Sequence, residues 1–348
     1  MREPIKVGLS AFGKASTIFH APLLHAHPNF ILSSVVERTK ENSRDLYPQV
    51  TIVRSFDELI ADPDIELIVI TTPNQLHFPQ ARQALEAGKH VVVDKPFTIY
   101  AEDAATLIEI AEKTQRVLSV FHNRRWDSDH QTVAQIIREN LLGDVVEYVS
   151  HFDRFRKELK PEAWRERDQP GAGILYDLGS HLIDQAVHLF GKPNQVFADV
   201  RTQRHHAEAD DNFEIILYYT NLKVTLKAGM LIPHALPRLQ VIGQEGSYVK
   251  YHMDVQEAHL KEGLVLTKVL EPEENWGQIF TSLKGITVKG KIPSVPASYL
   301  DYYSNIFKAI REGKELQVKP EEARLVIEII QVAMQSHYEK RVISLPLD

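Results

Sequence analysis

Residues 91–97 are Val91-Val92-Val93-Asp94-Lys95-Pro96-Phe97, three β-branched residues followed by a carboxylate, an amine and a proline. The valine run predicts a strand buried on both faces of a sheet, and Pro96 marks its carboxyl end because proline cannot continue a central strand. Ligands of open parallel α/β sheets gather at the carboxyl ends of the strands. Lys95 is therefore placed to reach a bound ligand, although a lone lysine in such a place is more often a solvated loop residue.

The segments around this strand alternate between short apolar strands and amphipathic helices. Further strands are predicted at residues 5–9, 31–36, 50–53, 67–71 and 117–121. Pro22 interrupts the first helix, so a kink or two short pieces are expected there. Regular alternation of this kind predicts a doubly wound parallel sheet, the Rossmann arrangement that binds dinucleotides.

The turn after the first strand has the position of the glycine-rich turn that receives a pyrophosphate at a helix amino terminus. Ala11, Gly13 and Ser16 stand where the pattern Gly-x-Gly-x-x-Gly is usual, so only the middle glycine is kept. The motif alone is weak, but the alternation of elements around it favours nucleotide binding. The cofactor-binding candidates in this turn are Ala11, Phe12, Gly13 and Lys14.

Two residues at the end of the second strand make opposite predictions about the cofactor. Glu37 could accept a hydrogen bond from the ribose 2′-hydroxyl of NAD and would repel a 2′-phosphate, whereas Arg38 could pair with the phosphate of NADP. We expect NAD to be accepted at least as well as NADP, with Arg38 along the adenine face. The alternative is that Glu37 points to solvent and Arg38 alone determines the preference between NAD and NADP.

The alternation of strands and helices stops after residue 122, and successive strands follow. This change predicts domains at residues 1–122 and 123–348. A helix at residues 128–140 is followed by strands at residues 145–155, 195–203, 213–219, 222–231, 239–242 and 248–252. Residues 222–228 alternate between apolar and polar, as in an antiparallel sheet with one wet face. The fold class is therefore a Rossmann domain plus an α+β domain with a large, mostly antiparallel open sheet. The strand at 213–219 is apolar on both faces, through burial within the domain or at an oligomer interface.

The second stretch that contains candidate catalytic residues runs from Gly173 to His181. Asp177 and His181 are four residues apart, so a helix would place them on one face, where the carboxylate could orient the imidazole as a general base. The alternative is an N-cap aspartate and a partly buried histidine. A metal site is not favoured, because no convincing third ligand accompanies Asp-x-x-x-His. Trp164-Arg165 is either a loop over a pocket or plain surface.

Four motifs together resemble the glucose–fructose oxidoreductase, inositol dehydrogenase and MocA family. They are Ala11-x-Gly13, Thr72-Pro73-Asn74-x-x-His77, Asp94-Lys95-Pro96 and Asp177-x-Gly179-x-His181. With the segment from His122 to Asp127 and with Trp164-Arg165, the chain most resembles the NADP-dependent scyllo-inositol dehydrogenase branch. Two departures are the missing glycines of the first motif and an aspartate in place of the usual glutamate of Glu-Lys-Pro.

The resemblance implies an NAD(P)-dependent dehydrogenase that acts on a hydroxyl carbon of a cyclic polyol or sugar. Lys95 would hydrogen-bond the reacting oxygen, His181 would accept its proton and Asp177 would assist at the substrate. The implied cofactor site also includes Thr72, Asn74, His77, Asp94, Lys95 and Asn123. The implied substrate site contains Lys95, Arg124, Trp164, Arg165, Asp177 and His181.

Composition narrows the remaining classes of function. The 348 residues carry a net charge of −7, which argues against general binding to nucleic acid or anionic membranes. The chain has no cysteine, and no apolar run reaches the ~20 residues of a membrane helix. Met1 is followed almost directly by a strand, so no signal peptide and a cytoplasmic location are expected.

We expect a homodimer or homotetramer formed through the second sheet. Rival functions are a catalytically silent NAD(P) sensor, aldose oxidation and redox-assisted glycoside cleavage.

Overall fold

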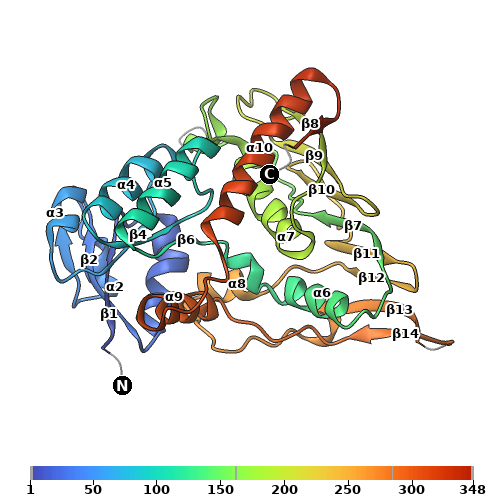
Figure 1. Ribbon diagram of the computed structural model, residues 1–348, viewed down its shortest axis with the longest axis horizontal. Helices are drawn as coiled ribbons and strands as arrows, with labels where there is room; N and C mark the ends of the chain where they lie inside the picture. Colours follow the sequence, from blue (N-terminus) through green and yellow to red (C-terminus); the bar gives the residue numbers. More distant parts are fainter. Residues whose placement is uncertain (1–2, 161–162, 284, 346–348) are drawn as a thin grey trace. The chain divides into compact units, whose positions relative to one another are not determined.

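A computed structural model describes residues 3–160, 163–283 and 285–345 of the chain. The chain divides into two units (Figure 1). The first consists of Met1–Asn123, Val255–Thr267 and Ser298–Arg324, and the second of Arg124–Asp254, Lys268–Ala297 and Leu325–Asp348. Two late segments that the sequence analysis placed in the second domain are thus part of the first unit.

The first unit is built on a six-stranded parallel sheet with the order β3-β2-β1-β4-β5-β6. The strands are β1 (Ile5–Leu9), β2 (Phe30–Val36), β3 (Thr51–Val53), β4 (Leu67–Ile70), β5 (His90–Val93) and β6 (Leu118–Val120). All of β4 is buried, and so are the three valines of β5, because neighbouring strands and helices enclose them. The predicted doubly wound parallel sheet is confirmed.

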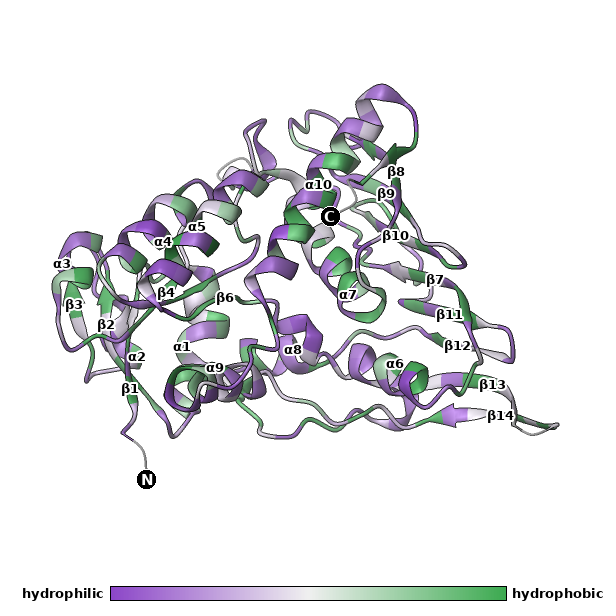
Figure 2. Ribbon diagram, in the orientation of Figure 1, coloured by the Kyte–Doolittle hydropathy of each residue, from purple (hydrophilic) through white to green (hydrophobic). Residues whose placement is uncertain are grey.

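The helices of the first unit follow the strands in alternation. They are η1 (Ser16–His20, a π-helix), α1 (Ala21–Ala26), α2 (Asn42–Leu46), α3 (Phe56–Ala61), η2 (Asn74–Leu76), α4 (His77–Glu86) and α5 (Ala101–Thr114). Pro22 lies at the start of α1, so the first helix consists of two short pieces as expected. Polar residues recur along α4 and α5, which lie side by side and bury one face each (Figure 2). The late segments add α8 (Gln256–Lys261) and α9 (Leu300–Glu312).

The second unit is built on a nine-stranded sheet with the order β14-β13-β12-β11-β7-β10-β9-β8-β15. Its strands are β7 (Val145–His151), β8 (Gln195–Arg201), β9 (Asn212–Tyr218), β10 (Lys223–Gly229), β11 (Leu239–Gly243), β12 (Gly246–Lys250), β13 (Gly277–Leu283), β14 (Ile286–Ile292) and β15 (Ile343–Ser344). Only the pair β7–β10 is parallel among the strand pairs of the described residues. The mostly antiparallel sheet was predicted, whereas β13, β14 and β15 were not.

The two faces of this sheet differ sharply in burial. One cross-strand row is almost inaccessible, with exposed fractions of 0–7%, and consists of Ile279, Tyr248, Val241, Tyr148, Val224, Leu217, Val196 and Ile343. The neighbouring row points to the opposite face and leaves Ile242 and Phe280 39% and 49% exposed. The helices α6 (Ser128–Arg138) and α7 (Ser180–Phe190) lie on one side of the sheet (Figure 1). Full two-sided burial within the chain is therefore wrong for β9, whose Ile216 and Tyr218 are only half-buried.

The last helix is α10 (Pro320–Glu339). Its Val326, Ile330 and Ala333 are fully buried. Within the described ranges 3–160, 163–283 and 285–345, no helix combines the length and hydropathy needed to span a membrane.

Candidate active site

The turn after β1 explains how a motif with one glycine can keep a geometry that suits a dinucleotide. Ser16 stands at the place of the third glycine and is fully buried; its hydroxyl donates to the carbonyl oxygen of Ala11 at 2.6 Å and lies 2.7 Å from the Thr71 hydroxyl. The serine therefore fastens the turn to the end of β4. A Cβ atom at Gly13 would meet no atom within 4 Å, so the backbone there borders open space. This space beside a helix start fits the pyrophosphate of a dinucleotide.

The other two candidates of this turn lie at its surface. Phe12 is half-buried and makes an edge-on contact with the Tyr47 ring at 6.4 Å between centroids. Lys14 is exposed.

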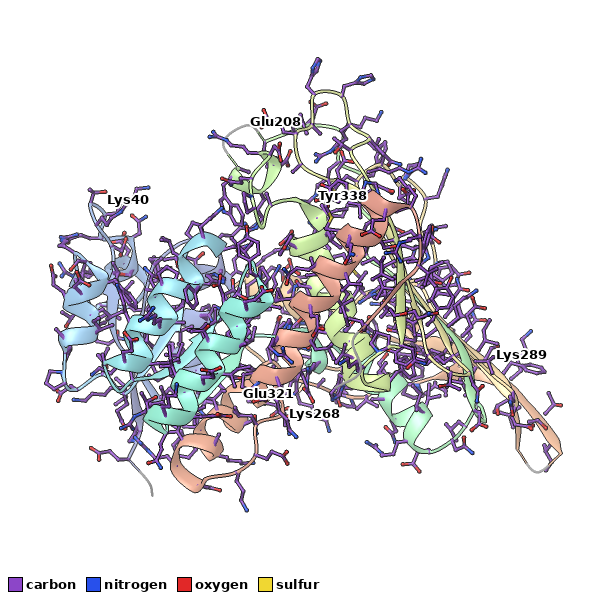
Figure 3. The ribbon with its side chains drawn as sticks, turned by 45° about the horizontal axis from the view of Figure 1, so that its top comes forward. Lys40, Glu208, Lys268, Lys289, Glu321 and Tyr338 are labelled. Carbon is purple, nitrogen blue, oxygen red and sulfur yellow. The ribbon has the colours of Figure 1, made fainter. Side chains whose placement is uncertain are left out.

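The end of β2 has a different geometry from the one expected. Glu37 is only 7% exposed, and its two carboxylate oxygens accept hydrogen bonds from the backbone N–H groups of Asn42 and Ser43, at 3.0 and 2.8 Å. The carboxylate thus satisfies the first turn of α2, and the idea that it points to solvent is wrong. Arg38, in contrast, is exposed, as is Lys40, which is labelled at the surface of the first unit in Figure 3.

The turns after β4 and β5 are joined by His77. Its Nδ1 lies 2.8 Å from the carbonyl oxygen of Pro96 and its Nε2 lies 2.9 Å from that of Thr72. Burial lowers the pKa of His77, and the Asp94 charge and the carbonyl acceptors oppose that shift. Asn74 on the same turn is 4% exposed, and His77 is the residue of this motif that contacts the turn containing Lys95.

Asp94 and Lys95 begin the turn after β5, and both are half-buried. The backbone N–H of Asp94 donates to the Ile70 carbonyl at 2.8 Å, which places this turn beside the end of β4. Burial raises the pKa of the Asp94 carboxyl, but the imidazole of His20 and the charges of Lys95 and His77 outweigh burial and hold that pKa below its usual range. The contact with His20 was not predicted, because His20 carries no recognisable motif.

The segment after β6 contains a cofactor-binding candidate, Asn123, and a substrate-binding candidate, Arg124, and both are buried. Asn123 is 4% exposed and Arg124 is 5% exposed, and the Arg124 guanidinium pairs with Asp127 at 3.1 Å. The next residue, Arg125, forms a bidentate pair with Asp184 of α7 at 2.6–3.1 Å. Within the second unit this buried pair anchors the helix that contains His181, a role that the sequence did not reveal.

The predicted base and its partner lie where a π-helix meets an α-helix. Asp177 is inside η5 (Leu175–Gly179), a π-helix, and His181 follows in the first turn of α7. The N-cap interpretation of Asp177 is therefore wrong, since Ile174 precedes η5 and Gly179 precedes α7. His181 is 6% exposed, and the Asp177 side chain is 25% exposed.

Trp164 and Arg165 belong to the same part of the second unit. They lie in η4 (Trp164–Glu166), where the Arg165 guanidinium stacks on the Trp164 ring at 4.7 Å. Arg165 Nε is 3.7 Å from Asp177 Oδ1. The structure thus brings Arg165, which is exposed, beside Asp177.

Asp210 holds the start of the helix that contains Asp177. Its Oδ2 accepts the Leu175 N–H at 2.8 Å, and its backbone carbonyl accepts the Ile174 N–H at 3.0 Å. Burial raises the pKa of Asp210 to about 6. Gly173 has φ +83°, and a Cβ there would lie 1.8 Å from Asp210 Oδ1, so this close approach requires glycine.

The functional candidates divide between the units. Lys95, Asp94, His77, Asn74, Thr72 and Asn123 belong to the first unit, and Arg124, Trp164, Arg165, Asp177 and His181 to the second. Within the described residues, no group of three or more His, Asp or Glu side chains is arranged to hold a metal ion.

Two family models match almost the whole chain. The NAD-binding Rossmann fold of the GFO_IDH_MocA oxidoreductase family matches residues 5–122, and the C-terminal alpha/beta domain of that family matches residues 134–345. The chain belongs to the Gfo/Idh/MocA oxidoreductase family. The resemblance inferred from the four motifs is confirmed, and with it an NAD(P)-binding dehydrogenase fold.

Individual relatives match this chain over almost its full length. The scyllo-inositol 2-dehydrogenase (NADP(+)) IolW of Bacillus subtilis (strain 168) is 41% identical, over 99% of this chain and 96% of that protein. The oxidoreductase YdgJ of Escherichia coli (strain K12) is 43% identical, over 97% of both chains. The structure of yvaA from Bacillus subtilis matches with a TM-score of 0.95 at 39% identity, covering 99% of both chains.

Proposed function

We propose that this protein is an NADP-dependent dehydrogenase that oxidises a ring hydroxyl of a cyclic polyol of the scyllo-inositol type. The observation that carries this proposal is the 41% identity to a scyllo-inositol 2-dehydrogenase over almost the whole chain. The chain also keeps a lysine, an aspartate and a histidine at Lys95, Asp177 and His181. A silent sensor would not need to retain all three.

Each of these residues has a distinct part in the proposed reaction. The Lys95 ammonium donates a hydrogen bond to the reacting oxygen and stabilises the negative charge that develops there. His181 accepts the hydroxyl proton, which leaves a ketone when the carbinol C–H bond breaks. Asp177, with Arg165 beside it, binds neighbouring hydroxyls of the ring. The bound nicotinamide supplies the chemistry of accepting the hydride.

The preference for NADP is inferred from the end of β2. The Glu37 carboxylate is buried and already accepts two backbone N–H groups, so it is poorly placed to select a free ribose hydroxyl. The exposed guanidinium of Arg38 can make a bidentate pair with a 2′-phosphate. We therefore replace the expectation of equal or better use of NAD by one of NADP preference.

We also propose that the protein self-associates through the open face of the nine-stranded sheet. Ile242, Ser247 and Phe280 form a cross-strand row on that face, and Phe280 is half exposed. Exposed apolar side chains such as Ile242 and Phe280 on an uncovered sheet face are typical of an interface between copies of a chain.

A substrate screen tests the proposed activity. Wild type and Lys95→Met would be mixed with NADP+ or NAD+ and with inositol isomers, aldoses or glycosides, and reduced nicotinamide would be followed by absorbance. We expect turnover of an inositol with NADP+, and a decrease in kcat on the order of 10² in Lys95→Met with cofactor affinity nearly unchanged. Turnover of aldoses or glycosides alone would favour the corresponding rival. Tight NADPH binding without any turnover would favour a sensor.

A further inference from the structure

His20 is a fully buried polar residue beneath the turn that contains Lys95. It ends the π-helix Ser16–His20, and π-helical turns occur frequently at functional sites. Its Nδ1 lies 2.7 Å from the hydroxyl of Tyr303 in α9, and its Nε2 lies 3.6 Å from Asp94 Oδ1. All three residues belong to the first unit.

The Tyr303 hydroxyl determines which ring nitrogen of His20 has the proton. Tyr303 is fully buried, and among the described residues its hydroxyl has His20 Nδ1 as its hydrogen-bond partner. A buried hydroxyl needs an acceptor for its proton, so Tyr303 donates to Nδ1. The remaining proton is then on Nε2, the nitrogen that faces Asp94.

The group opposite Nε2 is a carboxylate adjacent to the proposed catalytic lysine. The Asp94 side chain is 13% exposed, and its backbone N–H donates to the Ile70 carbonyl at 2.8 Å. At 3.6 Å the contact between Nε2 and the carboxylate is longer than a hydrogen bond and is electrostatic. An N–H group that faces a carboxylate favours its charged form. His20 can therefore bias the position of the Asp94 carboxylate, whose charge interacts with that of the neighbouring Lys95.

We propose that His20, held by Tyr303, is a positioning residue that fixes Asp94 and thereby orients Lys95 toward the reacting oxygen. The inference rests on the proposed role of Lys95. It assigns a function to two residues outside the recognised motifs, one of them in a late segment of the chain. Small displacements of a catalytic group lower turnover strongly, since hydride transfer depends on alignment.

Two substitutions of His20 separate positioning from packing. Glutamine places its amide nitrogen as far from Cα as Nε2, so His20→Gln keeps a donor for Asp94. The terminal amide of asparagine reaches only as far from Cα as Nδ1. His20→Asn therefore keeps an oxygen that can accept from Tyr303 and loses the donor for Asp94. We expect His20→Asn to lower kcat by roughly tenfold or more, with KM values for cofactor and substrate within about threefold. His20→Gln loses the Tyr303 contact but keeps the donor for Asp94, so it should lower kcat no more than Tyr303→Phe does.

A matched tyrosine provides the control. Tyr302 precedes Tyr303 and is also buried, but its hydroxyl donates to Ser119 at 3.2 Å. Tyr303→Phe should lower kcat by severalfold. Tyr302→Phe should lose as much thermal stability as Tyr303→Phe but leave kcat unchanged. Equal kcat values for His20→Asn and His20→Gln, or equal effects of the two tyrosine variants, would overturn the proposal and indicate packing alone.

A second readout does not depend on turnover. In protein labelled with 15N-histidine, NMR spectra should show His20 protonated at Nε2, and Tyr303→Phe should change the distribution between the two nitrogens. His20→Gln identifies the signal. A proton on Nδ1 in the wild type would overturn the proposal even with an active enzyme. If the predicted tautomer is found but no substrate is turned over, the proposed function fails and the tautomer assignment stands.

Discussion

Glu37 Oε1 accepts the backbone N–H of Ser43 at 2.8 Å, so a residue expected at the cofactor surface is a helix-end acceptor inside the first unit. The opposite oxygen accepts the Asn42 N–H at 3.0 Å. Carboxylates are favourable at helix amino termini because the backbone N–H groups there lack partners. Under the proposed preference for NADP, the positive charge beside the adenosine end of the cofactor would come from Arg38, which is exposed.

Arg38→Gln tests this arrangement. We expect the variant to lower kcat/KM for NADP+ by about tenfold or more and to change the value for NAD+ by less than about threefold, because a charge-assisted bidentate pair with the phosphate is lost. Arg82→Gln is the matched control, since Arg82 is an exposed arginine of α4 paired with Glu86. Glu37→Ser should lower the thermal midpoint and affect both cofactors alike. A wild type that prefers NAD+, or a shift of Glu37→Ser toward NADP+, would restore Glu37 as the selector.

The stability of the second unit should depend on the protonation of Asp210. Burial raises the pKa of this carboxyl from its ordinary value of 3.8 to about 6, so the folded state binds the proton more tightly than the unfolded state does. The stability that this group contributes is therefore fully present below pH ~4 and is lost as the pH rises through ~6.

Asp210→Asn should remove this dependence, because the amide is uncharged and its oxygen can still accept the Leu175 N–H. Above pH ~6 we expect the variant to be more stable than wild type by up to about 3 kcal/mol. Urea unfolding between pH 4 and 8 measures the difference. Asp168→Asn, at an exposed aspartate of the same unit, should leave the profile unchanged. A parallel profile for Asp210→Asn and wild type would contradict the assignment.

The open sheet face can be tested by charge. Phe280→Glu places a carboxylate in the cross-strand row with Ile242, and we expect a decrease in the mass measured by light scattering because a buried unpaired charge destabilises an interface. Leu270→Glu is the control, at a leucine that is 69% exposed outside the strands. A monomeric wild type, or an unchanged mass for Phe280→Glu, would show that this face is not the interface.

Local patterns predicted the elements well, whereas partners distant in sequence could not be predicted. The β-branched runs at β4 and β5 are buried central strands, as expected, because such residues suit a sheet covered on both faces. The strand β14 lies at the sheet edge and is almost entirely exposed, so burial does not select its residues; it was missed although Ile286, Val288 and Ile292 alternate with polar residues. Residues close in sequence, such as Arg165 and Asp177, could be singled out together, although their contact could not be seen. The partners His20 and Tyr303 are 283 residues apart, and no pattern connects them.

Transfer of deuterium tests the central claim most directly. Wild-type protein would be incubated with NADP+ and carbon-deuterated scyllo-inositol, and the reduced cofactor would be analysed by mass spectrometry. Direct hydride transfer from a ring carbon predicts NADPH that contains one deuterium from the substrate, formed much more slowly by Lys95→Met. Absence of reduced cofactor, or reduced cofactor without deuterium, would contradict the assignment of this protein as a dehydrogenase of cyclic polyols.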